Sequence, residues 1–165
     1  TLAALVGEVA GAHRLAAQAR CVTLEVDVPD GLLVQADRDK LRTILDNLLS
    51  NALKFARPSG RVALRAGRYP GGVAIEVEDD GPGVALEEQE RVFESFYRGD
   101  ASANGKVKGS GLGLAIVREY VLAHQGHVFI VEPGKPGGRF RVRLPLDLTR
   151  GGAPLTLTEG DSIAV

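Results

Sequence analysis

Apolar and polar residues alternate along this chain with two different periods, which indicates both helices and strands. From Arg38 to about Ala56, apolar residues recur every three or four positions, as on one buried helix face, and Asp37 stands at the expected N-cap. Helices are also expected at 2–20, which is rich in alanine, at about 86–96, and at 112–124. The last of these is apolar around much of its circumference, so we expect it to be well buried.

Segments with a period of two predict strands. These segments are 21–28, 32–36, 61–68, 73–79, 127–132 and 138–144. The turn sequence Tyr69-Pro70-Gly71-Gly72 joins two of them as an antiparallel hairpin. Together the elements predict an α+β fold, with a mixed, mostly antiparallel sheet of about five strands, a short hairpin, and about three helices on one face.

The composition narrows the class of protein. A length of 165 residues allows one domain with a good core, and the formal net charge of −1 gives no reason to expect nucleic acid as a partner. Cys21 is the single cysteine, so no internal disulfide can form, which fits a reducing compartment. No apolar run approaches the length of a membrane span, and no signal peptide opens the chain. Methionine is missing even at position 1, so we expect a processed chain or a piece of a longer protein.

A stripe of polar side chains runs beside the apolar face of the predicted helix at 38–56. Asn47, Asn51 and Lys54 are spaced i, i+4, i+7, which places two carboxamides and an ammonium group in one line. Asn competes with the backbone for hydrogen bonds and is a mediocre helix former. A solvated face is the favoured interpretation for an arbitrary helix, but the segments that follow favour a binding site.

The predicted strand at 73–79 ends in two adjacent aspartates. Strict alternation points Asp79 toward the core and Asp80 away from it. A carboxylate in the core needs hydrogen-bond donors, and Gly81 and Gly83 leave room for a ligand to approach the backbone. Adenine offers an amine donor at its edge, whereas guanine offers an acceptor. An Asp-Gly turn in which Asp79 caps a backbone amide fits the pattern equally well.

A polar, glycine-rich stretch at 98–111 predicts a mobile loop of the lid type. Its final glycines open a helix, where backbone N–H groups can face an anion, although such glycines often serve only packing. The pattern differs from a dinucleotide fingerprint, which directly follows a strand, and no Walker A lysine follows it. Before the loop, Phe93 and Phe96 are expected to anchor its base in the core. Arg98 either reaches a phosphate or is solvated.

In order and spacing, these segments resemble the catalytic, ATP-binding domain of sensor histidine kinases, in the superfamily that also contains gyrase B, Hsp90 and MutL. The matching motifs are the N box (47–55), the G1 box (79–83), the F box (93–98), the G2 box (109–114) and a closing strand at 137–145. The resemblance covers roughly residues 22–145. It implies the Bergerat α/β sandwich, with an ATP-binding catalytic domain at 22–146 and its lid at 98–111. Residues 1–21 would be a helix or linker from a missing dimerisation domain, and 147–165 a disordered tail.

The resemblance also implies roles for individual residues. Asn51 would ligate Mg²⁺ through its amide oxygen, in agreement with the preference of Mg²⁺ for hard oxygen ligands. Asn47 would support the metal–phosphate cluster, Lys54 would neutralise phosphate charge, and Asp79 would accept from the adenine amine. The other implied ATP contacts are Phe55, Gly81, Gly83, Arg98, Lys108, Gly109, Ser110, Gly111, Leu112 and Gly113. Lys106 is a weaker candidate. Phe55 replaces a frequent tyrosine, so it can pack against the nucleotide but cannot donate a hydrogen bond.

The histidines of the chain do not fit a phosphoacceptor site. None of His13, His124 and His127 is followed by the acidic residue expected after a substrate histidine. Relatives that hydrolyse ATP carry a glutamate where this chain has Asn47, and an amide has no basic lone pair at neutral pH. The same substitution argues against an anti-sigma-type serine kinase. The sequence therefore favours transfer of the ATP γ-phosphoryl group to a histidine on a separate domain.

The same resemblance implies the setting of this domain. We expect ATP and Mg²⁺ as ligands, and as partners the protein's own dimerisation and phosphoacceptor domain and a cognate response regulator. We expect this piece to be a monomer in the cytoplasm and the full-length protein to be a homodimer anchored in the plasma membrane. Two alternatives remain: a nucleotide-sensing or interaction module that transfers nothing, and a gyrase- or Hsp90-like ATPase.

Overall fold

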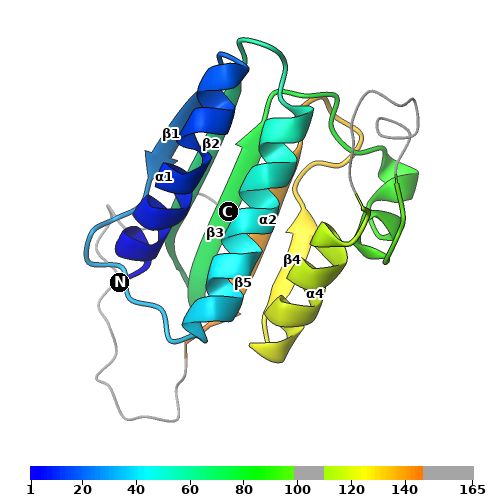
Figure 1. The fold of residues 1–165 in the computed structure, drawn as a ribbon. Coiled ribbons are helices and arrows are strands. Elements are labelled where there is room, and N and C mark those ends of the chain that lie inside the picture. The colour runs from blue at the N-terminus through cyan, green and yellow to red at the C-terminus, as the bar shows by residue number, and fades with distance from the viewer. Residues whose placement is uncertain (99–109, 147–165) are drawn as a thin grey trace.

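The structure is a computed structural model that describes residues 1–98 and 110–146. These residues form a five-stranded sheet that is covered on one face by three α-helices (Figure 1). The strand order is β1-β2-β3-β5-β4; β1 runs parallel to β2 and all other neighbours are antiparallel. The elements are α1 (Leu2–Ala19), β1 (Thr23–Asp27), α2 (Arg38–Phe55), β2 (Arg61–Tyr69), β3 (Gly72–Asp79), the 3₁₀ turns η1 (Leu86–Glu88) and η2 (Arg91–Phe93), α4 (Gly113–Ala123), β4 (His127–Ile130) and β5 (Arg139–Pro145). The predicted α+β class is confirmed.

The central helix α2 forms where the apolar period predicted it. The Asp37 carboxylate accepts from the backbone N–H groups of Asp39 and Lys40 at 3.0 Å each, so the predicted N-cap is confirmed. The apolar face is buried on the sheet (Leu41, Ile44, Leu45, Leu48, Leu49, Ala52 and Leu53). In Figure 1, α1 lies beside α2 in the same direction and α4 lies on its other side in the opposite direction.

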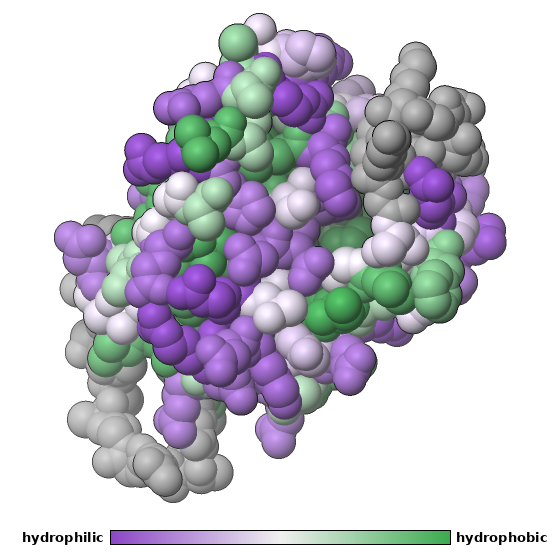
Figure 2. Space-filling view, in the orientation of Figure 1, coloured by the Kyte–Doolittle hydropathy of each residue, from purple (hydrophilic) through white to green (hydrophobic). Residues whose placement is uncertain are grey.

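The N-terminal helix α1 is part of the core. Leu2, Val6 and Val9 have 0% exposed area, and Leu5 has 3%. The outward surface of α1 and α2 is mainly hydrophilic, purple in Figure 2, so their apolar stripes face inward. Whether this helix continues from a dimerisation domain stays a prediction. None of the helices in the two described ranges has the length and hydropathy needed to cross a membrane.

The predicted short strand at 32–36 is wrong, and the described residues contain no strand outside the five-stranded sheet. The Leu32 N–H donates to the Pro29 carbonyl in a turn, and the Leu32 carbonyl accepts from the N–H of Leu2 at the start of α1. Both backbone groups of Leu32 are thus used locally and at a helix N-terminus, so they do not join a sheet. Leu32 is nevertheless buried, because its side chain packs in the core.

The predicted helix at about 86–96 is also wrong, since this stretch contains only the turns η1 and η2. Phe93 is buried and meets the Phe140 ring edge-on at 6.1 Å, as an anchor should. Phe96 does not anchor the loop: the residue is 72% exposed and its φ is +63°. The Phe96 N–H donates to the Gly111 carbonyl, which ties the backbone in a conformation that turns the ring outward.

The helix α4 is less buried than its composition suggested. Only Val117 and Val121 are fully buried, and Leu122 is 55% exposed. Within the described residues, α4 contacts α2, η2, β4 and β5. Apolar composition predicted this helix correctly but overstated its burial.

Candidate nucleotide site

The amide stripe of α2 lies at the edge of the buried helix face. Asn47 and Asn51 are half-buried and Lys54 is exposed. The Asn47 side-chain NH₂ donates to the Thr43 carbonyl at 2.8 Å, one turn earlier in the same helix. This bond occupies the amide nitrogen of Asn47 and leaves its amide oxygen for contacts outside α2.

The amino end of α4 packs on this stripe. A Cβ placed on Gly113 would stand 2.8 Å from the Asn47 Oδ1, so the helix backbone and the amide are in direct contact. Just before it, Gly111 has φ +74° and lies against the backbone of Phe96 and Tyr97. The Leu112 N–H donates to the Ser110 Oγ at 3.3 Å. Close packing against neighbouring atoms therefore explains why glycine stands at both positions. The two glycines also leave the start of α4 without side chains beside the amides of α2.

The turn after β3 holds the predicted inward carboxylate. Asp79 is 5% exposed, and its Oδ1 accepts from the Gly81 N–H at 2.8 Å and from the Gly138 N–H at 3.4 Å. Burial raises the pKa of Asp79 to about 6, against the opposing effect of these two N–H donors. The inward direction is confirmed, and so is the backbone-capping interpretation. An adenine contact is compatible with this cap, because a carboxylate has more acceptor sites than two donors fill.

Glycines surround Asp79 because other groups lie too close for side chains. A Cβ on Gly138 would meet the Asp79 Oδ2 at 2.5 Å, and one on Gly81 would meet the Phe55 carbonyl oxygen at 2.2 Å. Gly83 has φ +79° and lies against the Lys135 carbonyl. Sequence reasoning missed Gly138 as a partner of Asp79, since nothing but the glycine pair at 137–138 marks that loop.

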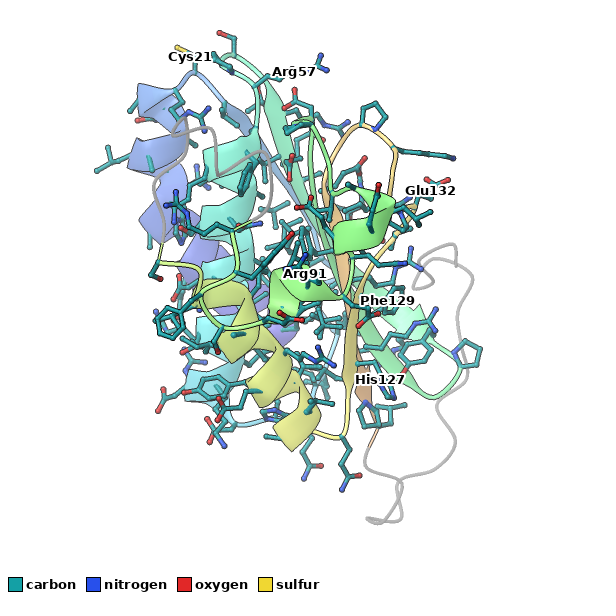
Figure 3. All side chains as sticks on the ribbon, turned by 90° about the vertical axis from the view of Figure 1, so that its right-hand side faces the viewer. Cys21, Arg57, Arg91, His127, Phe129 and Glu132 are labelled. Atoms are coloured by element: carbon teal, nitrogen blue, oxygen red, sulfur yellow. The ribbon has the colours of Figure 1, made fainter. Side chains whose placement is uncertain are left out.

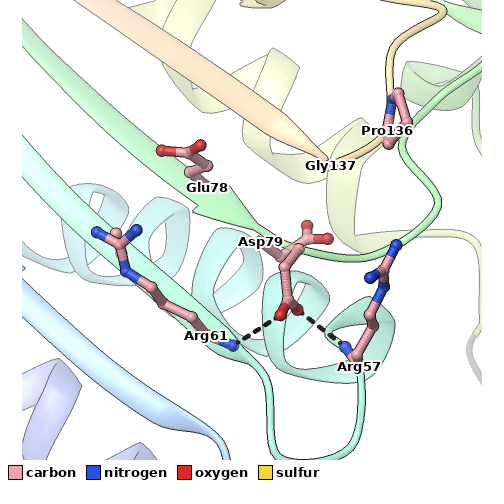
Figure 4. A pocket seen from close by; sticks show the side chains of 8 residues that line it. Arg57, Arg61, Glu78, Asp79, Pro136 and Gly137 are labelled. Atoms are coloured by element: carbon pink, nitrogen blue, oxygen red, sulfur yellow. Dashed lines mark hydrogen bonds between the residues drawn. The ribbon is translucent and has the colours of Figure 1, made fainter.

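The neighbouring Asp80 has a structural role. Its two carboxylate oxygens accept from the backbone N–H groups of Arg57, at 3.0 Å, and Arg61, at 3.1 Å, and so close the turn between α2 and β2 (Figure 4). A pocket of about 290 Å³ lies beside it. Its lining consists of Arg57, Arg61, Ala63, Glu78, Asp79, Asp80, Pro136 and Gly137. The pocket includes Asp79 but none of the amide residues of α2, so it is not the predicted nucleotide site as a whole.

The helix α2 joins the two halves of the candidate site. Its Asn47 touches Gly113 of α4, and its Phe55 carbonyl touches Gly81 of the Asp79 turn. Eight residues separate the two contacts, which is about 12 Å along a helix. Asn51 lies midway between them. Arg98 is exposed at the edge of the described residues, and Lys106, Lys108, Gly109 and most of the predicted lid fall in 99–109, outside them.

Comparison with known proteins decides the family. The model of the family described as histidine kinase-, DNA gyrase B- and HSP90-like ATPase matches residues 36–148. The chain belongs to this family. The match spans the amide stripe, the Asp79 turn and the amino end of α4, the three parts of the candidate site.

Within the family, proteins similar to this chain include sensor histidine kinases. The chain is 37% identical over 141 residues to the sensor-like histidine kinase SenX3 of Mycobacterium tuberculosis, covering 86% of this chain and 34% of that protein. It is 37% identical over 144 residues to the sensor histidine kinase GlrK of Escherichia coli, covering 87% of this chain and 30% of that protein. The chain thus spans about a third of the length of the curated relatives it matches. This part of them corresponds to the ATP-binding catalytic domain of a two-component kinase.

Solved structures show the same fold. Full-length ShkA in complex with AMPPNP matches with a TM-score of 0.77 and 34% identity, over 88% of this chain and 30% of that chain. The mycobacterial sensor histidine kinase MprB matches with a TM-score of 0.72 and 30% identity, over 87% of this chain and 93% of that chain. The predicted sandwich, with three helices on one face of a mixed sheet, is therefore the fold of histidine kinase catalytic domains.

Proposed function

We propose that this domain binds ATP with Mg²⁺ and transfers the γ-phosphoryl group to a histidine on a separate dimerisation and phosphoacceptor domain, from which a response regulator takes it. The observation that most supports the proposal is the arrangement along α2, where the amides lie between the glycine end of α4 and the buried carboxylate of Asp79. Such an arrangement suits a ligand with an amine at one end and phosphates at the other.

The base end of the ligand would lie at the Asp79 turn. The adenine amine would donate to the Asp79 carboxylate, which the Gly81 and Gly138 N–H groups hold in one orientation. Phe55 is half-buried at the adjacent end of α2 and would pack against the base. The bare backbone of Gly81 and Gly83 would let the ligand approach closely.

The phosphate end would lie between the amides and the start of α4. Asn51 offers a hard amide oxygen of the type that Mg²⁺ accepts, and Mg²⁺ usually takes only one or two protein ligands beside phosphates and waters. When bound, Mg²⁺ would neutralise charge on the phosphates. Asn47 would hold its amide oxygen toward the phosphates, because its NH₂ is engaged by Thr43, and Lys54 would add a positive charge from solvent. The remaining proposed contacts are Arg98, Lys108, Gly109, Ser110, Gly111, Leu112 and Gly113.

The mechanism would be positioning and charge neutralisation. Phosphoryl transfer demands an in-line nucleophile and compensation of charge rather than covalent participation by the domain. No carboxylate stands at the position of Asn47 to activate water. The nucleophile would be the imidazole of the phosphoacceptor domain, and water would react slowly. We further propose a homodimeric, membrane-anchored full-length protein with this domain in the cytoplasm.

A transfer assay tests the proposal. The chain is mixed with the separately produced phosphoacceptor domain of the same protein, Mg²⁺ and γ-labelled ATP, and the acceptor is expected to gain acid-labile, base-stable phosphate. The Asn51→Ala variant should transfer far less at the same Mg²⁺ concentration, whereas Arg14→Ala, a change on the exposed side of α1, should transfer normally. Rapid hydrolysis without acceptor would favour the ATPase alternative. Binding without any transfer would favour the nucleotide-sensing module.

A further inference from the structure

The carboxyl end of α2 is held by a side chain from another helix. A helix leaves its last four carbonyl groups without partners inside the helix, which here include those of residues 53–56. Arg20, the C-cap residue of α1, donates to three of them: to the Leu53 carbonyl, to the Lys54 carbonyl at 3.1 Å and to the Ala56 carbonyl at 2.7 Å. A single guanidinium thus satisfies most of the end of α2.

Among the carbonyl groups of residues 53–56, Arg20 does not bind that of Phe55. The Phe55 carbonyl lies against the Asp79 turn. A Cβ on Gly81 would come within 2.2 Å of this oxygen, so the backbones of α2 and of the turn touch at this point. Gly81 in turn donates its N–H to Asp79 at 2.8 Å. A short path therefore connects Arg20 to Asp79 through the last turn of α2.

The backbone of Arg20 strengthens the same contact. Its carbonyl accepts from the Ser59 N–H at 3.1 Å, in the loop that follows α2. Cys21 and Arg57, which lie just beyond the ends of α1 and α2, are found together at one end of the molecule in Figure 3. Arg20 therefore hydrogen-bonds to the last turn of α2 through its side chain and to the loop after α2 through its backbone carbonyl.

Further contacts fix α1 along the rest of α2. The Glu8 carboxylate pairs with Arg38, at 2.7 Å, and with Arg42, and the His13 Nε2 lies 3.1 Å from the Asp46 Oδ1. With Arg20 they form a row of polar contacts between two helices that run in the same direction. Arg20 is the member of this row that reaches the end of α2 where the base is proposed to bind.

We propose that Arg20 is a positioning residue for the nucleotide site: from α1, it holds the last turn of α2 so that Phe55, Gly81 and Asp79 keep the spacing that the adenine base requires. The inference rests on the proposed function, because it assumes that the base lies at this turn. It differs from ordinary helix capping in one consequence. Loss of the guanidinium lowers the nucleotide affinity of the folded protein, in addition to its stability.

The experiment compares four variants by calorimetric titration with a non-hydrolysable ATP analogue and with ADP, at a temperature where each variant is folded. Arg20→Ala removes the guanidinium that donates to the carbonyl groups at the end of α2. Arg20→Lys keeps the charge but lacks the planar fork that reaches several carbonyls at once. Arg14→Ala removes the same charge from an exposed position on α1, and Val9→Ala loosens the packing of α1 in the core without touching α2 carbonyls.

Arg20→Ala is expected to bind both nucleotides about tenfold more weakly, and Arg20→Lys about threefold, since a residue that acts through others changes affinity by such factors. The loss should be equal for the two nucleotides, because the base end is what moves. Arg14→Ala and Val9→Ala should bind as the wild type, although Val9→Ala unfolds more easily. If Arg20→Ala does not fold, the affinity of Arg20→Lys is compared with that of the wild type instead.

Two results would overturn the inference. One is wild-type affinity in the folded Arg20 variants; the other is an equal loss of affinity in Val9→Ala at matched stability, which would make the effect one of general loosening. A wild-type chain that binds neither nucleotide would instead refute the proposed function itself. The two failures are therefore distinguishable in one set of titrations.

Discussion

Gly113 lies directly against the carboxamide of Asn47. A Cβ on this first residue of α4 would stand 2.8 Å from the Asn47 Oδ1 and 3.6 Å from its Cγ. The amide is already oriented, because its NH₂ donates to the Thr43 carbonyl. The contact joins the helix of the amides to the helix whose start is proposed to face the phosphates, so a methyl group placed there disturbs the site at its centre.

The Gly113→Ala substitution should separate stability from function. Replacing glycine by alanine stabilises a protein by about 0.4–1 kcal/mol through the lower entropy of the unfolded chain, which offsets the cost of turning the short Asn47 side chain aside. We therefore expect the free energy of unfolding to stay within about 1 kcal/mol of the wild type, while phosphoryl transfer falls about ten- to a hundredfold because a group near the phosphates is displaced.

Gly7→Ala is the matched control for this change. It introduces the same methyl group into α1, at a position where a Cβ would meet nothing within 4 Å. Urea unfolding should show it equally or more stable, and its transfer rate should equal that of the wild type. Unchanged transfer in Gly113→Ala would show that the orientation of Asn47 does not matter for the reaction.

The buried carboxyl of Asp79 should make stability depend on pH. Burial raises the pKa of Asp79 to about 6 in the folded protein, whereas the ordinary value of this group, expected in the unfolded chain, is 3.8. Between these values the folded state binds more protons than the unfolded state, so the stability contributed by this group falls as the pH rises from about 4 to 6. A shift of this size corresponds to about 3 kcal/mol. Urea unfolding of wild type and Asp79→Asn across this range isolates it, because the other carboxyl groups cancel in the difference.

Nucleotide affinity should depend on pH in the opposite direction. The adenine amine donates more strongly to the ionised carboxylate than to the neutral acid, so the Asp79 contribution to affinity is largest above a pH of about 6 and weakens as the pH falls through that value. At neutral pH, Asp79→Asn should weaken ATP binding by one to a few kcal/mol, roughly the value of a charged hydrogen bond. Equal affinities of the two proteins in calorimetric titrations at neutral pH would remove Asp79 from the adenine site.

Local periodicity was sufficient to predict much of the site. The period of 3.6 placed Asn47 and Asn51 on one stripe of α2, and the period of 2 directed Asp79 inward; the structure agrees with both. What it could not predict are contacts between distant segments. The Gly138 N–H reaches Asp79 from 59 positions away, and the Phe55 carbonyl touches Gly81 only because α2 and the turn end at the same place.

Two errors have the same origin. The segment at 32–36 alternates like a strand, but Leu32 bonds to Leu2 of α1, which the local pattern does not reveal. Phe96 has the composition of an anchor, yet its backbone bond to Gly111 turns the ring into solvent. In both cases a backbone hydrogen bond to a remote residue overrode a side-chain preference. The roles of the site residues in binding and transfer stay predictions.

On the face of the sheet opposite the three helices, the described residues form a buried ion cluster that alternation alone did not suggest. Glu76 points away from the helices, yet its side chain is only 1% exposed. Its carboxylate accepts from the Arg139 Nε at 2.7 Å and from the Arg141 Nε at 2.8 Å. Farther along this face, Phe129 and His127 of β4 also point away from the helices (Figure 3). Arginines from β5 thus cover the glutamate of β3 and exclude water from it.

Removing the charge of Glu76 should destabilise the domain strongly. Breaking a buried ion pair costs about 3–5 kcal/mol, because it leaves the partner charge without compensation. We expect Glu76→Gln to lower the free energy of unfolding by that amount. Glu78→Gln is the matched control: its side chain is 38% exposed and pairs with Arg65, so the cost should stay below about 1 kcal/mol. Similar losses in the two variants would mean that burial does not set the strength of these pairs.

The carboxyl end of α4 contains a strained residue whose replacement should stabilise the protein. Gln125 has φ +57° in the cap where its N–H donates to the Leu122 carbonyl and the Gly126 N–H donates to the Val121 carbonyl. A helix end with this pair of hydrogen bonds normally has glycine at the position of Gln125. The left-handed conformation costs a residue with a Cβ about 1–2 kcal/mol, part of which glycine loses again through its freer unfolded chain. Gln125→Gly should therefore raise the free energy of unfolding by about 0.5–1 kcal/mol.

The matched control keeps the Cβ. Gln125→Ala removes the same polar side chain from an exposed position but leaves the steric cost, so we expect no gain in urea unfolding. Cys21 provides an independent repeat, because it has φ +55° in the same kind of cap at the end of α1. Cys21→Gly should add its own increment to that of Gln125→Gly, since the two caps end different helices and share no contact in the described residues. A gain in Gln125→Ala equal to that in Gln125→Gly would assign the effect to the lost side chain rather than to the backbone conformation.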